Sequence, residues 1–404
     1  MNDEAKKPRA LITEDGSYPL DLTGPRSHTL VIEPGVGGLS IGPASLGKKV
    51  NLHVEPEQRI NWRAFDAFAT PAGSPWPRWL YYSGGDSGFL TWASERPIEG
   101  MEWTPILPAD MPVDASKSRI GRLTIKLSQT GGRLRLTLPN RETSPYFRLS
   151  VMGNLARFSA NGDMPLSLAL VPRTSPRKNG GSFQLPDMGA LHQVTDLSLR
   201  SEPMTQPISL QCLSRFPNLK SLSLYGSFSN LDQLAGQPQL KNLHLRYMPD
   251  LGGLPALNVW PELDSFIAFN VEEAAGKRLR QQVKAHAAVR PWANLVSVSQ
   301  LRKPEWWAAE YGRPFSSWPA RLAKLANAAY DAALAALAHA RSLAEAEAAL
   351  IAFAARFNTL KGIETPERDD LGEAVWQLSQ SEHAARLGVT EEMAQSWFDA
   401  VRDY

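Results

Sequence analysis

Side chains that could do chemistry are present in this sequence, but not at the spacings that catalytic or metal sites need. None of the seven histidines stands in an HExxH motif or at a paired metal-ligand spacing. Cys212 lacks the sequence context of a nucleophile, and no serine lies in a GxSxG elbow. We therefore expect no catalytic residues, no bound metal and no cofactor, and a protein that is not an enzyme.

The segment from Gly42 to Lys49 resembles a phosphate-binding loop, GxxxxGK followed by Ser or Thr. It departs from that form at Lys49, which replaces the hydroxyl that would hold Mg²⁺. The strand-like run 50–54 follows it, whereas a phosphate loop leads into a helix N-terminus. We interpret the segment as a hairpin loop.

A group of carboxylates near the end of the chain is a second candidate for chemistry. It lies at the start of a predicted helix, where the helix dipole favours negative charge, so a structural role is the simpler interpretation. The alternative is a recognition patch for a basic partner. The group is formed by Glu364, Glu367, Asp369 and Asp370.

A repeated pattern in the middle of the chain is more informative. The frame LxxLxL begins at Leu219 and Leu240, with a degraded copy at Leu263 and an upstream copy at Val194. These starting positions are 25, 21 and 23 residues apart, within the period of leucine-rich repeats. Each repeat forms one short strand whose leucines need stacked neighbours to cover them. We expect a short leucine-rich repeat solenoid over residues 181–270.

The residues between these leucines are expected on the concave face of the strands. One column on that face alternates arginine with aromatic residues, the types most common at interface hot spots. His244 lies in the neighbouring column. The alternative is that the arginines only stack on their neighbours, or that another part of the chain covers them. The predicted protein-binding site is Arg200, Tyr225, His244, Arg246 and Phe269.

Residues 1–180 alternate apolar and polar side chains over short runs, which is typical of strands. The runs 123–127 and 133–138 flank a Gly-rich segment and predict a hairpin. We expect an N-terminal all-β domain, a sandwich or barrel. Its tryptophans are expected mainly to pack the core, with a carbohydrate site as the alternative; they are Trp62, Trp76, Trp79, Trp92 and Trp103.

Residues 271–404 predict a C-terminal helical bundle. One helix is expected to run to Val289, before Pro291. Ser342 with Glu345 forms a capping box at the start of another helix, and Thr390 begins the last one. The predicted fold is therefore mixed α and β with three domains: 1–180 β-rich, 181–270 repeats and 271–404 helical.

Composition narrows the choice of partners and compartment. The 404 residues carry a net charge of only +2 and no long basic run, so nucleic acid is not an expected partner. No apolar stretch is long enough to span a bilayer, and no secretory signal is evident. The single cysteine suits a reducing compartment. We expect a cytoplasmic protein without membrane contact.

Roughly residues 190–380 resemble a bacterial group of leucine-rich repeat domain-containing proteins. The resemblance implies that the chain is a candidate immunity partner of a secreted toxin, and it implies no catalytic residues. It is carried by the repeats and by the segments 270–280, 304–307, 314–318, 357–358 and 363–370.

The leading hypothesis is a non-enzymatic immunity protein that neutralises a bacterial toxin sterically. Two alternatives stay open. One is an interaction scaffold or regulatory protein, and the other is a carbohydrate-active enzyme with its site in the N-terminal β domain.

Overall fold

The computed structural model describes residues 11–33, 37–68, 78–174, 181–201, 206–304, 306–307, 313–315, 318–363 and 365–403. Contacts divide the chain into two compact units, Met1–Leu301 and Arg302–Tyr404. Among the described residues, no helix combines the length and apolarity that crossing a bilayer requires.

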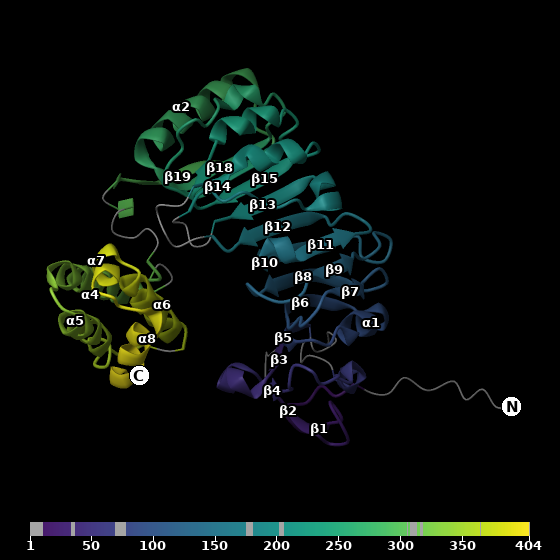
Figure 1. Ribbon diagram of the computed structural model, residues 1–404. Coiled ribbons are helices and arrows are strands. Elements are labelled where there is room, and N and C mark those ends of the chain that lie inside the picture. Colours follow the sequence, from purple (N-terminus) through teal and green to yellow (C-terminus); the bar gives the residue numbers. More distant parts are fainter. Residues whose placement is uncertain are drawn as a thin grey trace. The chain divides into compact units, whose positions relative to one another are not determined.

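The first unit is built on one twelve-stranded sheet in the described part of the chain (Figure 1). Every pairing from β4 to β18 is parallel. In spatial order the strands are β4 (Leu52–His53), β3 (Gly38–Gly42), β5 (Trp79–Gly84), β6 (Ile98–Pro105), β8 (Ile120–Leu127), β10 (Arg148–Gly153), β12 (Ser167–Pro172), β13 (Asp196–Arg200), β15 (Ser221–Tyr225), β17 (Asn242–Met248), β18 (Ser265–Glu272) and β19 (Val296–Arg302).

Two columns of buried side chains hold these strands in register. Alternate residues of a strand point to one face, so each strand contributes one residue to each column. Burying one such side chain contributes about 1.5–3 kcal/mol, which no single strand can achieve alone. One column runs Leu39, Leu80, Met101, Leu123, Leu149, Leu168, Leu197, Leu222, Leu243, Phe266, and the other Ile41, Tyr82, Trp103, Ile125, Val151, Leu170, Leu199, Leu224, Leu245, Ala268.

Each strand of the large sheet belongs to one coil of the solenoid, and smaller elements form the side of the coil opposite that strand. In the middle of the unit, a second parallel sheet lies behind the first and comprises β7 (Met111–Asp114), β9 (Leu134–Thr137) and β11 (Phe158–Asn161). Further along, β14 (Ile208–Ser209) pairs with β16 (Phe228–Ser229). Short 3₁₀ helices complete the coils at Ala44–Lys49, Trp62–Phe65, Leu155–Arg157, Gly189–Gln193, Leu210–Arg215, Leu231–Gly236 and Leu257–Val259.

The two ends of the sheet carry different additions. Near β4, the antiparallel hairpin of β1 (Gly16–Leu20) and β2 (His28–Ile32) contributes Leu20 and Leu30 to the core. The helix α1 (Gly88–Glu95) packs Phe89 against Trp62 and Trp103. At the other end, α2 (Glu273–Val289) begins where the Glu272 carboxylate accepts hydrogen bonds from the backbone N–H groups of Ala274 and Ala275.

The second unit, Arg302–Tyr404, is helical, whereas the predicted helix that ends at Val289 is α2 of the first unit. Ser342 accepts a hydrogen bond from the Glu345 backbone N–H, and Thr390 accepts one from Met393. Its core includes Leu350, Phe353 and Phe357. The described α-helices of this unit are α4 (Ala320–His339), α5 (Leu343–Ala355), α6 (Thr365–Ser379), α7 (Glu382–Arg386) and α8 (Glu391–Val401).

The predicted fold class is wrong in its first two parts. Residues 1–180 do not form a separate all-β domain, and the solenoid is not short. Strands β3 to β12 belong to the same parallel sheet as the repeat strands, and one buried core extends from Leu20 to Leu279. The repeat is hidden in the N-terminal half because its inward positions include Met101, Tyr82 and Trp103 rather than leucine. Its coils also vary in length, since inward residues from Leu80 onward are 19 to 29 residues apart.

The predicted hairpin at 123–138 is also wrong. β8 and β9 belong to different sheets, and Gly131 and Gly132 form the corner between them. A Cβ at Gly132 would lie 2.0 Å from the backbone of Ala109 in the preceding coil, so the corner admits only glycine there. The loop at 42–49 likewise joins β3 to β4, which are parallel, so it is not a hairpin loop.

We expect Gly153→Ala to destabilise the first unit by about 2 kcal/mol or more. Gly153 ends β10 with φ +89, and a Cβ there would lie 2.0 Å from the carbonyl oxygen of Leu127. Urea unfolding measures the effect. Gly236→Ala is the matched control because nothing lies within 4 Å of its Cβ position. Equal losses in the two variants would contradict the tight corner.

Candidate functional site

Four of the five predicted site residues lie in register across neighbouring strands. Arg200 of β13 pairs with Tyr225 of β15, which pairs with Arg246 of β17, which pairs with Phe269 of β18. Their side chains alternate with the buried leucines, so they lie on the outer face of the sheet, opposite the core. Arg246 is exposed and the other three are half-buried. The parallel register therefore assembles the predicted column into one continuous row.

Ring contacts link Arg200, Tyr225 and Phe269 through a further residue, Tyr247. The Arg200 guanidinium carbon lies 4.1 Å from the centre of the Tyr225 ring, a cation–π arrangement. The Tyr225 ring is 4.7 Å from that of Tyr247, and the Tyr247 ring is 6.0 Å from that of Phe269 in an edge-to-face arrangement. We call these residues, Arg200, Tyr225, Arg246, Tyr247 and Phe269, the aromatic row.

Tyr247 is the member that sequence reasoning missed. Its φ is +54, a left-handed conformation that costs a non-glycine residue about 1–2 kcal/mol. The following residue in each neighbouring strand, Gly226 and Asn270, is also left-handed, with φ of +101 and +50. Glycine and asparagine tolerate this conformation, so their alignment after the repeat frame was a usable signal. The bend carries the Tyr247 ring to both aromatic neighbours.

His244, the fifth predicted residue, lies one column away on the same strand as Arg246. It pairs in register with Ser223, and the Ser223 Oγ is 3.4 Å from His244 Nδ1. Burial and the nearby Arg246 lower the pKa of His244, while Asp196 acts in the opposite direction. Burial also raises the pKa of the Asp196 carboxyl, and a hydrogen bond from the Ser221 side chain lowers it by less. These groups give the outer face a polar strip beside the aromatic row.

Cys212 and the acidic cluster are the remaining candidates for chemistry. Cys212 is buried, and burial raises the pKa of its thiol to about 11. Among the described residues, no three His, Cys, Asp or Glu side chains are grouped to hold a metal ion. In the acidic cluster, Asp370 accepts a hydrogen bond from the Trp318 indole at 2.9 Å, a packing role; Glu364 and the Asp369 side chain lie outside the described residues.

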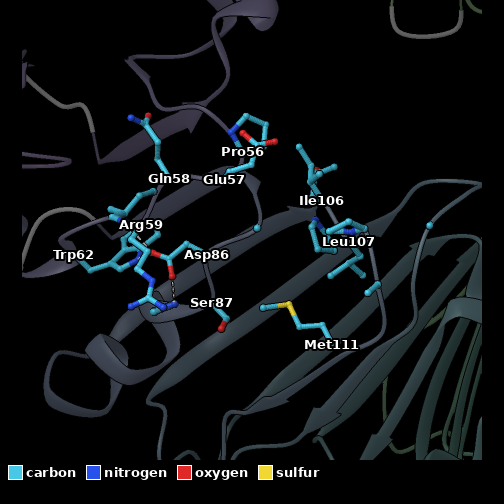
Figure 2. Close-up of a pocket in the computed structure, with 18 of the residues that line it drawn as sticks. Pro56, Glu57, Gln58, Arg59, Trp62, Asp86, Ser87, Ile106, Leu107 and Met111 are labelled. Carbon is cyan, nitrogen blue, oxygen red and sulfur yellow. Dashed lines mark hydrogen bonds between the residues drawn. The ribbon is translucent and has the colours of Figure 1, made fainter.

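A pocket of about 1240 Å³ opens at the carboxyl ends of β5, β6 and β8 (Figure 2). Its walls are the loops that follow these strands, together with residues 56–63. Figure 2 shows Pro56, Ile106 and Met111 around it, so much of the lining is apolar. Sequence patterns had not indicated this pocket, because its lining comes from loops of varied length.

The Asp86 carboxylate, one of the polar groups that line this pocket, is already engaged. Asp86 Oδ2 accepts hydrogen bonds from the Trp62 indole and the Ile60 backbone, each 2.9 Å long, and Oδ1 accepts one from Gly88. Trp62 and Trp92 are only 3% and 4% exposed, so neither offers an open ring face to a sugar. Trp76 lies outside the described residues. Asp86 and the two tryptophans therefore act mainly to hold the loops in place.

No known family model, curated protein or solved structure matches this chain.

We expect His244→Gln to reduce the loss of stability on acidification. The folded-state pKa of His244 is lowered, so its neutral form stabilises the fold above the unfolded pKa of about 6.5, and this stability is lost as the pH falls. Unfolding of wild type and variant at about pH 7.5 and about pH 5.5 measures the difference. Part of the loss should persist, because burial also lowers the pKa of His192 and His286. If His244→Gln loses as much stability on acidification as wild type, His244 does not contribute to the pH dependence. His339→Gln is the control, because His339 is exposed on the last turn of α4.

Proposed function

We propose that this chain is a non-enzymatic protein-binding protein whose contact surface centres on the aromatic row. One observation carries the proposal: the parallel register of four strands sets Arg200, Tyr225, Arg246 and Phe269 side by side on the outer face. Arginine and tyrosine supply much of the binding energy at protein interfaces, and they cluster near the interface centre. Clustered, half-buried side chains are already ordered, so less side-chain freedom is lost on binding.

The left-handed Tyr247 supports the same proposal. A glycine at this position would avoid the backbone strain, as Gly226 does in the preceding strand. Strain of this kind is commonly stored at functional sites. The Tyr247 ring extends the row between Tyr225 and Phe269, and this extended apolar surface is what a partner would contact.

In its most specific form, the proposal is an immunity protein that neutralises a bacterial toxin in the cytoplasm. The support is the resemblance over roughly residues 190–380 and the single buried cysteine, which suits a reducing compartment. The mechanism would be steric, with the outer face of the sheet covering the toxin's active site. Such blocking needs no chemistry from this chain, in keeping with the arrangement of its polar groups.

Co-expression with the product of the adjacent gene tests this role. Rescue of the host from growth arrest, together with co-purification of the two proteins, is the expected result. A neighbour that is not toxic, or rescue without a complex, would contradict the immunity role.

We expect Tyr225→Ala and Arg246→Ala each to weaken the complex by about 2 kcal/mol, about 30-fold in Kd. Each variant removes one member of the row without altering the buried columns. Calorimetry with the purified partner measures the loss. Unchanged affinity in both variants would remove the aromatic row from the interface.

We expect Tyr247→Gly to weaken binding by a similar factor while changing the free energy of unfolding by no more than about 1 kcal/mol. The glycine relieves the left-handed strain, which offsets the lost ring contacts and the added freedom of the unfolded chain. Tyr247→Phe retains the ring and should bind as wild type does. Strong destabilisation by the glycine with binding intact would show that Tyr247 serves the fold alone.

A further inference from the structure

The outer face of the sheet carries more unpaired positive charge than the net charge of the chain suggests. Four arginines lie on it, and none forms a salt bridge with a described residue. They are Arg122 of β8, Arg148 of β10, Arg200 of β13 and Arg246 of β17. Elsewhere in the first unit, exposed arginines such as Arg63, Arg78 and Arg135 each pair with a carboxylate. Arg26, Arg59 and Arg141 are also exposed without a salt bridge to a described residue, so what distinguishes this face is that four such arginines lie on strands of one sheet.

Two of these arginines stand directly beside each other. Arg122 and Arg148 are register partners on neighbouring parallel strands, and both are exposed. Like charges in this position destabilise a sheet. Neither forms a salt bridge with a described carboxylate, although Asp196 interacts electrostatically with Arg148. A carboxylate from outside the chain could bridge the two guanidinium groups and turn their repulsion into attraction.

Trp79 contacts one member of this pair, Arg122. Its ring lies over Gly100, where a Cβ would come within 2.2 Å of the indole, and reaches Arg122 on the next strand. The Arg122 guanidinium carbon is 5.5 Å from the centre of the ring. An arginine over an aromatic ring thus occurs at two places on the same face, at Trp79 and at Tyr225.

We infer that the partner presents acidic side chains to this face, spread from Arg122 to Arg246. The inference rests on the proposed function and names the chemistry of its partner. Strands lie about 4.8 Å apart, so the face from β8 to β18 is about 30 Å long, comparable to the width of a standard protein interface. The aromatic row supplies the apolar contact at one end, and Arg122 with Arg148 receives carboxylates at the other.

A protein suits this face better than a nucleic acid. Among the described residues, two carboxylates lie near the arginines: Glu102, paired with Lys126 at 2.6 Å, and Asp196, whose pKa is raised by burial and which interacts electrostatically with Arg148. A phosphodiester backbone is uniformly negative and would meet both of them. A folded protein can place its carboxylates opposite the arginines and leave other groups opposite Glu102 and Asp196. The partner is accordingly an acidic protein surface.

The experiment uses the full chain and a fluorescein-labelled copolymer of glutamate and tyrosine as the acidic probe. Fluorescence anisotropy measures binding at about 50 and about 300 mM NaCl, because screening separates ion pairing from apolar contact. Binding of the acidic copolymer should weaken at least about 10-fold at the higher salt. Arg148→Glu and Arg246→Glu should each weaken it by about 10-fold or more at the lower salt.

Three matched measurements decide the outcome. Arg141→Glu is the charge control, since Arg141 is exposed and lies in the loop between β9 and β10, away from the strands of the large sheet. An equal loss in Arg141→Glu would overturn the inference in favour of general net charge. A short DNA duplex that binds more tightly than the copolymer would overturn it in favour of nucleic acid. A lysine–tyrosine copolymer that binds equally well would show that charge sign does not matter.

Failure of the inference and failure of the proposed function are distinguishable. The aromatic-row variant Tyr225→Ala is measured against the co-purified partner in parallel with Arg148→Glu. Loss in Tyr225→Ala with no loss in Arg148→Glu would overturn the acidic surface and leave the protein-binding function standing. No loss in either variant would overturn both.

Discussion

Two columns of apolar side chains, from Leu39 to Phe266 and from Ile41 to Ala268, are the constraint on which the first unit depends. A strand of five or six residues buries too little surface alone, so each must stack in register on its neighbours. A shift by one residue would move every leucine to solvent, and the register is therefore strongly specified. The same register fixes the opposite face. Because the leucines of β13, β15 and β17 are aligned, the same register places three outer residues in a row: Arg200, Tyr225 and Arg246.

The ends of the strands are a second consequence of stacking. Each coil must turn sharply after its inward residues, and the turn uses left-handed residues at Gly153, Gly226, Tyr247 and Asn270. Glycine accepts this conformation at the crowded Gly153 corner, where no side chain fits. Tyr247 occupies the same kind of turn with a large ring. The turn is thus required by the fold, whereas a tyrosine there is not, which separates the structural role of the backbone from the proposed binding role of the side chain.

Sequence reasoning succeeds where the pattern follows from local physics. The frames beginning at Val194, Leu219, Leu240 and Leu263 lie in adjacent parallel strands, and the caps at Ser342 and Thr390 begin helices. It fails for residues 38–172 because a parallel coil constrains which positions are buried, not which apolar residue fills them. Trp103 and Leu224 occupy the same inward column. The length of each coil is equally unconstrained, since extra residues leave the sheet as loops. The hairpin prediction failed because the glycine corner at 131–132 has the composition of a hairpin turn. The register of Arg200, Tyr225, Arg246 and Phe269 was predictable. Tyr247 was missed because it lies one position past the frame, where Gly226 and Asn270 of the neighbouring strands were the usable signal. The pocket beside Asp86 was not predictable, because loops of varied length line it.

A stacked sheet of this kind aligns equivalent positions, which suits the protein-binding role proposed above. Catalysis needs different groups to converge on one reacting atom, within hydrogen-bond distance of it. Stacked strands instead repeat equivalent positions about 4.8 Å apart along a line. His244 and Ser223 approach each other only to 3.4 Å, and Asp86 in the pocket already accepts hydrogen bonds from three N–H groups. Equivalent positions along a line can repeat the same type of side chain over an extended surface. Here the repeated arrangement is arginine against an aromatic ring, at Arg122 over Trp79 and at Arg200 over Tyr225, and an extended surface of acidic and apolar groups is what complements it.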